Sequence, residues 1–276
     1  MPKVSARNIT VNYEQQGSGE PLILIPHLAA DHACYAFQLN DYAAHFACIS
    51  IDLRGTGESD DPAGEYSTET LADDVAAMMH AIGVQTAHVA GLSMGGAVGL
   101  WLAAKYPAKV KSLSVHSCWP KTDLYLRSVL ESWQTAARAL ASVSETLIQA
   151  IFPWCFTPEL YAARPDYIQS LCDFVRSRPT QSVESFLRQS NAVITHDVET
   201  QLSQITAPTQ ITFGRYDMVT STRFAEKMTS AIRNSELVVF ETSSHAPIYE
   251  SVEEFNPTTL QFLRRQSGRA SAAGAA

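Results

Sequence analysis

The sequence lacks any long apolar run. Its N-terminal segment, MPKVSARNITVNYEQQ, has no continuous hydrophobic stretch of the kind that a signal peptide or a membrane span requires. Positive charge is also scarce, because 20 Lys and Arg stand against 28 Asp and Glu, for a formal net charge of -8. Nucleic acid and membrane surfaces are therefore not expected as partners, since phosphate binding depends on clustered basic side chains. We expect a cytoplasmic protein with a small neutral or apolar ligand.

Cysteine is infrequent and has no framework spacing. The five cysteines are odd in number, widely spread and never arranged as CxxC, so neither a disulfide framework nor a zinc site is predicted. We expect reduced, mostly buried thiols and no metal or other cofactor. Internal repeats are lacking too, and the only low-complexity segment is the tail 266–276, QSGRASAAGAA, whose small residues offer nothing to bury. That tail is predicted to be disordered.

What is present is an alternation of short apolar runs with longer amphipathic segments. The runs are apolar at nearly every position, which is typical of strands buried on both faces of a parallel sheet. They are PLILIP (21–26), FACISID (46–52), AHVAG (87–91), KSLSVHS (111–117), TQITFG (209–214) and ELVVFET (236–242). Residues 67–82 begin with a Ser or Thr cap, carry acids in the first turn and space their apolar residues along one helical face. We therefore predict an α/β fold with a doubly wound, mostly parallel sheet.

The order of these segments predicts a domain organisation. Residues 119–206 show amphipathic helices (ESWQTAARALASVSETLIQAIF, then SVESFLRQSNAVI) and no convincing strand. We interpret them as a helical cap, or lid, inserted into a core formed by residues 1–118 and 207–265, which closes with a helix at SVEEFNPTTLQFLRR. A chain of 276 residues is long enough for one large α/β core with such an insertion.

The stretch GLSMGG surrounds Ser93 with glycines. Gly91-Leu92-Ser93-Met94-Gly95 matches G-x-S-x-G, and it stands between a predicted strand and a predicted helix. In that position the pattern presents a serine hydroxyl on a sharp, strained turn, and glycine avoids collisions with the sheet and the helix. The free amides at the start of the following helix favour negative charge beside the serine. The alternative is a plain turn in which Ser93 caps the helix.

A serine nucleophile needs a base, and the base needs an orienting acid. Asp217 in FGRYD and His245 in TSSHAPIYE each follow a predicted strand directly and keep the chain order Ser, acid, His. Asp123 is a rival acid and Asp197 a weaker one. Among the other histidines, three lie inside helix or strand patterns and are interpreted as packed structural residues, whereas two have no obvious partner. The first group is His80, His88 and His116, and the second is His45 and His196.

Four motifs together resemble the α/β-hydrolase family. They are GLSMGG, the turn DLRGTGESD at 52–60, the acid loop GRYD and the segment SSHAPIYESVEEFN. The likeness covers roughly residues 8–265 and is greatest to the 3-oxoadipate enol-lactonase and carboxylesterase branch. The segment FPWCFTPELY resembles the cap of the lactonases. It implies a triad of Ser93, Asp217 and His245, with an oxyanion hole from the backbone amides of Met94 and Leu28. The loop PHLAA (26–30) departs from the family's His-Gly-x-Gly, with Ala29 at the later glycine.

The substrate implied by the resemblance is a small carboxylic ester or lactone. Seven aromatic residues in the insertion could line an apolar pocket or pack the cap; they are Trp119, Tyr125, Trp133, Phe152, Trp154, Phe156 and Tyr161. Of these we take Trp119 and Trp154 as candidate substrate-binding residues. His27 is a further candidate, with the alternative that it only fills space. Arg127, Arg176 and Arg178 could meet a substrate carboxylate, although surface solvation explains each of them as well.

Three other functions fit the same motifs. A carbon–carbon bond hydrolase would use the same triad, but Leu92 and Ala246 stand where that group has Asn and Trp. A perhydrolase would differ mainly in pocket shape, and a small-molecule receptor on a hydrolase scaffold would turn over slowly or not at all. The sequence leaves these alternatives open, and it is compatible with a monomer or a homodimer.

Overall fold

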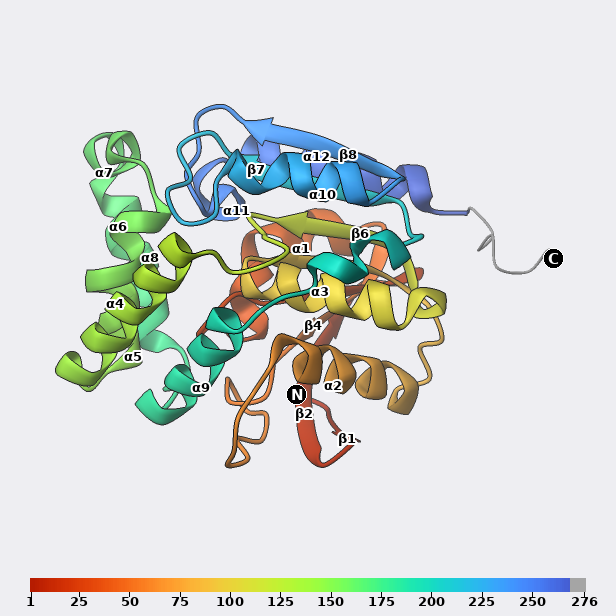
Figure 1. The fold of residues 1–276 in the computed structure, drawn as a ribbon, viewed down its shortest axis with the longest axis horizontal. Helices are drawn as coiled ribbons and strands as arrows, with labels where there is room; N and C mark the ends of the chain where they lie inside the picture. Colours follow the sequence, from red (N-terminus) through yellow and green to blue (C-terminus); the bar gives the residue numbers. More distant parts are fainter. Residues whose placement is uncertain (269–276) are drawn as a thin grey trace.

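The computed structural model describes residues 1–268 and contains one mixed sheet of eight strands (Figure 1). The strands are β1 (Lys3–Ala6), β2 (Ile9–Gln16), β3 (Glu20–Ile25), β4 (Phe46–Ile51), β5 (Ala87–Leu92), β6 (Val110–His116), β7 (Thr209–Gly214) and β8 (Ser235–Phe240). Their spatial order is β1-β2-β4-β3-β5-β6-β7-β8. β1 and β2 pair antiparallel with their neighbours, and all the other pairs are parallel. The α/β fold with a mostly parallel sheet is thereby confirmed.

Helices cover both faces of the sheet. α2 (Thr68–Ala81) and α3 (Met94–Lys105) contact each other and lie on one face with α10 (Ala225–Ala231), whereas α1 (Ala36–Ala43) packs against α12 (Val252–Gln266) on the other. Every residue of β4, β5 and β7 is buried, which agrees with continuous apolar runs covered from two sides. Four of the five cysteines are buried, Cys155 is half-buried, and all five are free thiols, as expected.

The chain between β6 and β7 is helical. Its helices are α4 (Leu124–Leu140), α5 (Val143–Thr146), α6 (Phe152–Cys155), α7 (Pro158–Ala163), α8 (Pro165–Ser177) and α9 (Val183–Ile194), with a π-helical turn at Leu147–Ile151. In Figure 1 the arrowheads of β6 and β8 point toward the side on which these helices lie. The cap helices therefore stand over the carboxyl ends of the parallel strands, where ligands of open α/β sheets bind.

Several elements differ from the expectation. The predicted helix over 131–152 is interrupted, because Ala141 takes a left-handed conformation at φ 50° and Ser142 begins a new helix by accepting a hydrogen bond from the amide of Glu145. α7 and α8 were not predicted, although each begins with a proline, which suits a first helical turn. The short helix α11 (Pro247–Glu250), which follows His245, was also not predicted.

Two of the remaining histidines correct the sequence interpretation. His80 is exposed at the end of α2 rather than packed. His196 does have partners: it is buried, its Nδ1 lies 2.7 Å from the hydroxyl of Thr68, and its Nε2 lies 3.1 Å from the carbonyl oxygen of Trp119. Burial lowers the pKa of His196 to about 4, because the charged ring would lose its hydration.

The C-terminal prediction concerns mostly undescribed residues. Gln266, the first residue of the predicted tail, is instead the last residue of α12 and is buried. Residues 269–276 lie outside the described part of the chain, so the predicted disorder there stays a prediction. Among residues 1–268, none of the helices combines the length and the hydropathy that crossing a membrane would require.

The turn DLRGTGESD, which follows β4, is hydrogen-bonded to β2 and to the loop after β3. The buried carboxylate of Asp52 accepts hydrogen bonds from the amide and ring of His32 at 2.7 and 2.8 Å, and from the side chain of Asn12 at 2.7 Å. Gly57 lies so close that a Cβ there would come 2.1 Å from the same carboxylate. The loops that follow β3 and β4 are thus fixed to each other beside the site described below.

The buried neutral His196 predicts a pH dependence of stability. Its pKa is about 4 when folded and about 6.5 when unfolded, so the unfolded chain binds the additional proton between these values. The contribution of His196 to stability is therefore complete above pH 6.5 and is lost as the pH falls toward 4. We expect the free energy of unfolding, measured with urea, to fall less steeply over that window in His196→Gln than in the wild type. Equal slopes would contradict the neutral buried ring.

Candidate active site

Ser93 stands on a sharp turn between β5 and α3. Its backbone has φ 53° and ψ −115°, a strained conformation that residues other than glycine seldom adopt. Two of its neighbours must lack a side chain. A Cβ on Gly91 would come 2.2 Å from the carbonyl oxygen of Gly95, and one on Gly95 would come 2.2 Å from the carbonyl oxygen of Ile25. The glycines therefore allow the turn itself and its contact with the end of β3.

The loop at residues 26–30, which follows β3, packs against this turn. A Cβ on Gly95 would also come 2.7 Å from the carbonyl oxygen of Pro26, so the two backbones touch directly. Ala29, which occupies the position of a family glycine, adopts φ 63°. The side chain of Gln189 in α9 lies 3.4 Å from the Ala29 amide and accepts its hydrogen bond. The left-handed conformation is thus kept without glycine, and a cap residue supports it.

The structure brings Ser93, His245 and Asp217 together in a chain of hydrogen bonds. His245 Nε2 lies 3.1 Å from Ser93 Oγ, and His245 Nδ1 lies 3.0 Å from Asp217 Oδ2. His245 and Asp217 are both buried. An ionised carboxylate only accepts hydrogen bonds, so Nδ1 carries the proton toward Asp217 and Nε2 is left to accept the proton of the serine hydroxyl. This is the arrangement in which a histidine can act as a general base toward a serine.

Asp217 is held in its charged form. Burial opposes ionisation, but the adjacent His245 and hydrogen bonds from Thr220 outweigh it and lower the pKa of the Asp217 carboxyl. The amides of Val219 and Thr220 donate to Oδ1 at 2.8 and 2.9 Å, and the Thr220 hydroxyl donates to Oδ2 at 2.7 Å. Sequence reasoning missed Thr220, although an Asp followed three residues later by Thr is a pattern of local turn hydrogen bonding.

The two rival acids are engaged elsewhere. Asp123 caps α4 by accepting a hydrogen bond of 2.7 Å from the amide of Leu126, and it pairs with Arg223 at 2.9 Å. Asp197 pairs with Lys121 at 2.6 Å. Neither acid contacts His245, so Asp217 is the carboxylate that orients it.

The two amides predicted for an oxyanion hole border the serine turn. Met94 is the first residue of α3, and Leu28 lies in the loop that contacts Gly95. Over residues 1–268, neither the Met94 nor the Leu28 amide donates a hydrogen bond to a protein group. Free amides at a helix start favour a developing negative charge. The carbonyl of Leu28 lies 2.9 Å from His27 Nδ1, which fixes the orientation of the peptide that follows Leu28.

A cavity opens beside Ser93. Its walls are mostly apolar and come from the cap and from the loops at the sheet edge: His27, Leu28, Leu92, Ser93, Trp133, Leu147, Ile151, Phe152, Cys155, Phe156, His245, Ala246 and Tyr249. A concave, mostly apolar lining with a few polar groups is typical of sites for small molecules. Trp133, Phe152 and Phe156 are the cap aromatics that reach it, and Tyr249 was not foreseen.

Two of the candidate substrate-binding residues do not line this cavity. Trp119 is buried in the core, donates its indole N–H to Thr122 at 2.8 Å and packs edge-on against His196. Trp154 is partly buried against the core, and its neighbour Cys155 reaches the cavity instead. For both tryptophans the packing alternative is correct. His27 does line the cavity, with Nε2 at 3.3 Å from the Tyr249 hydroxyl.

Glu250 connects the cap with the histidine loop. Its carboxylate accepts hydrogen bonds from the amide of Ser244 at 2.7 Å and from the amide of Thr157 at 3.0 Å. The amide of Ala246 in addition donates to the carbonyl of Cys155 at 3.1 Å. The residues on both sides of His245 are thereby tied to the cap. Sequence reasoning missed this role because Thr157 and Cys155 lie far from Glu250 and Ala246 in the chain.

Comparisons with known proteins agree with this geometry. A model of the α/β hydrolase fold matches residues 17–252, and the chain belongs to the α/β-hydrolase family. AB hydrolase superfamily protein YisY of Bacillus subtilis is 28% identical over 272 residues, covering 92% of this chain and 96% of that protein. 3-Oxoadipate enol-lactonase 2 of Acinetobacter baylyi is 26% identical over 266 residues, covering 95% and 96%.

A solved structure shows the same fold over nearly the whole chain. The enol-lactonase from Burkholderia xenovorans LB400 superposes with a TM-score of 0.84 at 22% identity, covering 95% of this chain and 100% of that one. The family and these relatives support hydrolase activity for the chain. The resemblance read from the four motifs is therefore confirmed at the level of family and fold.

The close contact at Gly95 predicts an asymmetry between two glycines of α3. Gly95→Ala should lower the free energy of unfolding by about 1–3 kcal/mol and displace Ser93, because its Cβ would collide with backbone atoms that cannot move aside. Gly99→Ala is the matched control, since its Cβ would meet side-chain methyl groups rather than backbone, those of Leu113 at 3.1 Å and Val89 at 3.8 Å. Urea unfolding and circular dichroism would measure both variants. Equal destabilisation would contradict the account of the turn.

The different hydrogen bonds of Asp217 and Asp123 predict different effects of their replacement on turnover. Asp217→Asn should lower hydrolytic turnover by about 10⁴-fold, the loss seen when the acid of a serine protease triad is replaced, because His245 would no longer be held in the required tautomer. Asp123→Asn should retain wild-type turnover, since asparagine also caps helices. Steady-state assays of both variants on one ester provide the measurement. A large loss in Asp123→Asn with a small one in Asp217→Asn would reverse the assignment.

Proposed function

We propose that this hydrolase cleaves carboxylic esters or lactones through an acyl-enzyme on Ser93. One observation carries the proposal: a serine hydroxyl on a strained turn lies 3.1 Å from a histidine whose other nitrogen is bonded to a buried carboxylate, at the wall of an apolar cavity. The names of two relatives, both enol-lactonases, support a lactone as the substrate.

In the proposed mechanism, His245 Nε2 takes the proton of Ser93 as Oγ attacks the substrate carbonyl. The carbonyl oxygen becomes an oxyanion that accepts hydrogen bonds from the amides of Met94 and Leu28. The imidazolium of His245 then donates its proton to the departing alcohol or enol oxygen, and the acyl group remains on Ser93. The negative charge of Asp217 stabilises the imidazolium in both half-reactions.

Water completes the cycle by the reverse sequence. His245 removes a proton from a water molecule, the resulting hydroxide attacks the acyl carbonyl, and Ser93 recovers its proton as the acid is released. Each oxyanion donor typically contributes about 100- to 1,000-fold in rate, whereas the nucleophile of a serine protease contributes about a millionfold. Every step uses side chains and amides of this chain together with substrate and water.

Ser93→Ala tests the proposal. Purified wild type and variant would be assayed on p-nitrophenyl esters from acetyl to decanoyl and on an enol-lactone. We expect multiple turnovers in the wild type and a loss of about 10⁶-fold in the variant, which has no nucleophile. Ser170→Ala, which changes an exposed serine of α8, is the control and should turn over at the wild-type rate.

Either of two results would contradict the proposal. Equal rates for wild type and Ser93→Ala would remove Ser93 from the chemistry. Binding of esters followed by at most one slow turnover in the wild type would instead support a small-molecule receptor built on a hydrolase scaffold.

A further inference from the structure

A second cavity adjoins the one at Ser93. The two share His27, Leu147, Phe152, Phe156 and Tyr249, so they meet along these side chains. Beyond them the second cavity runs between the cap and the loops that follow β3 and β4. Its apolar walls include Leu171, Phe174 and Val175 of α8. The shared side chains place this second, largely apolar space directly beside the cavity at Ser93.

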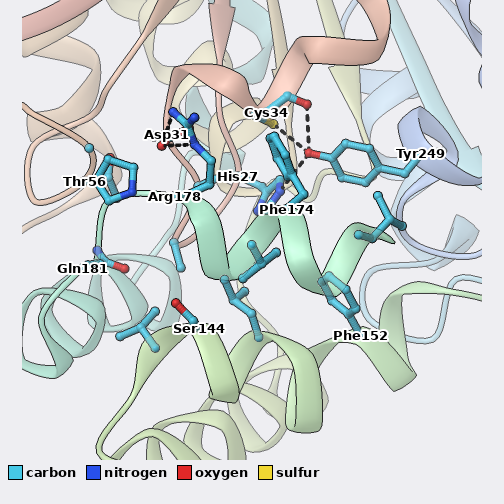
Figure 2. Close-up of a pocket in the computed structure, with 18 of the residues that line it drawn as sticks. His27, Asp31, Cys34, Thr56, Ser144, Phe152, Phe174, Arg178, Gln181 and Tyr249 are labelled. Carbon is cyan, nitrogen blue, oxygen red and sulfur yellow. Dashed lines mark hydrogen bonds and ion pairs between the residues drawn. The ribbon is translucent and has the colours of Figure 1, made fainter. Parts of the chain in front are cut away.

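The far end of this second cavity is polar. In Figure 2 Tyr249 and Phe152, which also border the Ser93 cavity, lie on one side, and Gln181 and Ser144 lie toward the other. The amide oxygen of Gln181 and the hydroxyl of Ser144 are both turned toward the interior. Within residues 1–268, the Gln181 oxygen is buried and accepts no hydrogen bond, and the Ser144 hydroxyl makes none with protein groups.

The orientation of the Gln181 amide is fixed by its neighbours. Gln189 donates from Nε2 to the carbonyl of Arg54 at 2.9 Å, so its Oε1 is an acceptor. Gln181 Nε2 donates to that Oε1 at 3.1 Å and to the carbonyl of Gly55 at 2.9 Å. The nitrogen of Gln181 is thereby committed to two acceptors, and the oxygen remains as an acceptor without a donor. Leaving such a buried acceptor without a donor costs free energy.

The charges near this end compensate each other. Arg178 lines the cavity, but its guanidinium donates to Asp31 at 2.8 Å and lies 3.2 Å from the ring of His32. The carboxylate of Asp52 is hydrogen-bonded to Nδ1 of that ring. A substrate carboxylate would meet Asp31 as well as Arg178 and would face the acceptor oxygen of Gln181. The far end thus favours a neutral donor over an anion.

We propose that the second cavity is a specificity subsite for an arm of the ester that is apolar along its length and ends in a neutral hydrogen-bond donor, such as a hydroxyl group. The donor binds the amide oxygen of Gln181, and its own oxygen accepts from the hydroxyl of Ser144. This inference rests on the proposed function of Ser93, since it concerns the substrate of that same site.

The test compares arms of matched length. Hexanoyl, octanoyl and decanoyl p-nitrophenyl esters would be assayed beside their ω-hydroxy and ω-carboxy analogues, and a parallel series would place the same groups on the alcohol of acetate esters. In at least one series we expect the ω-hydroxy compound to have the highest kcat/KM and the ω-carboxy compound the lowest. Acetyl p-nitrophenyl ester, which reaches only the Ser93 cavity, tests the proposed function separately.

Variants assign the preference to the subsite. Gln181→Met and Ser144→Ala should each reduce the ratio of kcat/KM for hydroxy over unsubstituted esters by about 2- to 13-fold, the range for one hydrogen bond. Gln169→Met, an exposed glutamine on α8, is the matched control and should keep the wild-type ratio. Ser144→Ala removes a hydroxyl that bonds no protein group, so it is informative even if Gln181→Met folds poorly.

The outcomes separate the two proposals. Turnover of the acetyl ester without any preference for ω-hydroxy arms, or with a preference for ω-carboxy arms, would overturn the subsite and leave the serine hydrolase intact. A preference that neither variant reduces would also overturn it. Lack of turnover on every ester would refute the proposed function itself.

Discussion

The contact on which the site depends is made by backbone alone. Gly95 of α3 lies so near the end of β3 that a single Cβ would be 2.2 Å from the carbonyl oxygen of Ile25. This contact holds the loop with the Leu28 amide against the turn that strains Ser93 to φ 53°. Asp217 and His245 follow β7 and β8, and parallel strands end at one edge of the sheet, so both arrive at the same place. The glycines around Ser93 exist to let these backbones meet.

The sequence was informative for the buried strands and for the serine turn. The runs that became β4, β5 and β7 are buried at every position, and G-x-S-x-G has its meaning only between a strand and a helix. It failed for side chains whose roles depend on their hydrogen-bond partners. Glu250 ties the histidine loop to the cap through a bond from the amide of Thr157, which is 93 residues away. Thr220 was missed although it stands only three residues after Asp217. Trp119 misled because an aromatic residue near a site fills the core as readily as a pocket.

The cap is hydrogen-bonded to the core at the turn after β4 and at the loop of His245. Gln181, Ser185 and Gln189 donate to the carbonyls of Arg54 and Gly55, which belong to the turn after β4. Glu250 and Cys155 connect the cap to the loop of His245. The cavity walls are therefore shared between cap and core, so the cap shapes both the position of the histidine and the space available to a substrate.

Covalent trapping of Ser93 would show directly whether its hydroxyl is activated. A fluorophosphonate probe reacts with a serine only when a base activates its hydroxyl. Labelling would therefore show that the hydrogen bond of 3.1 Å between Ser93 and His245 activates the serine. The protein would be labelled, digested and analysed by mass spectrometry. The account predicts one phosphonyl group per chain, on the peptide that contains Ser93, and none in His245→Ala. An unlabelled protein, or a label on another residue, would contradict it.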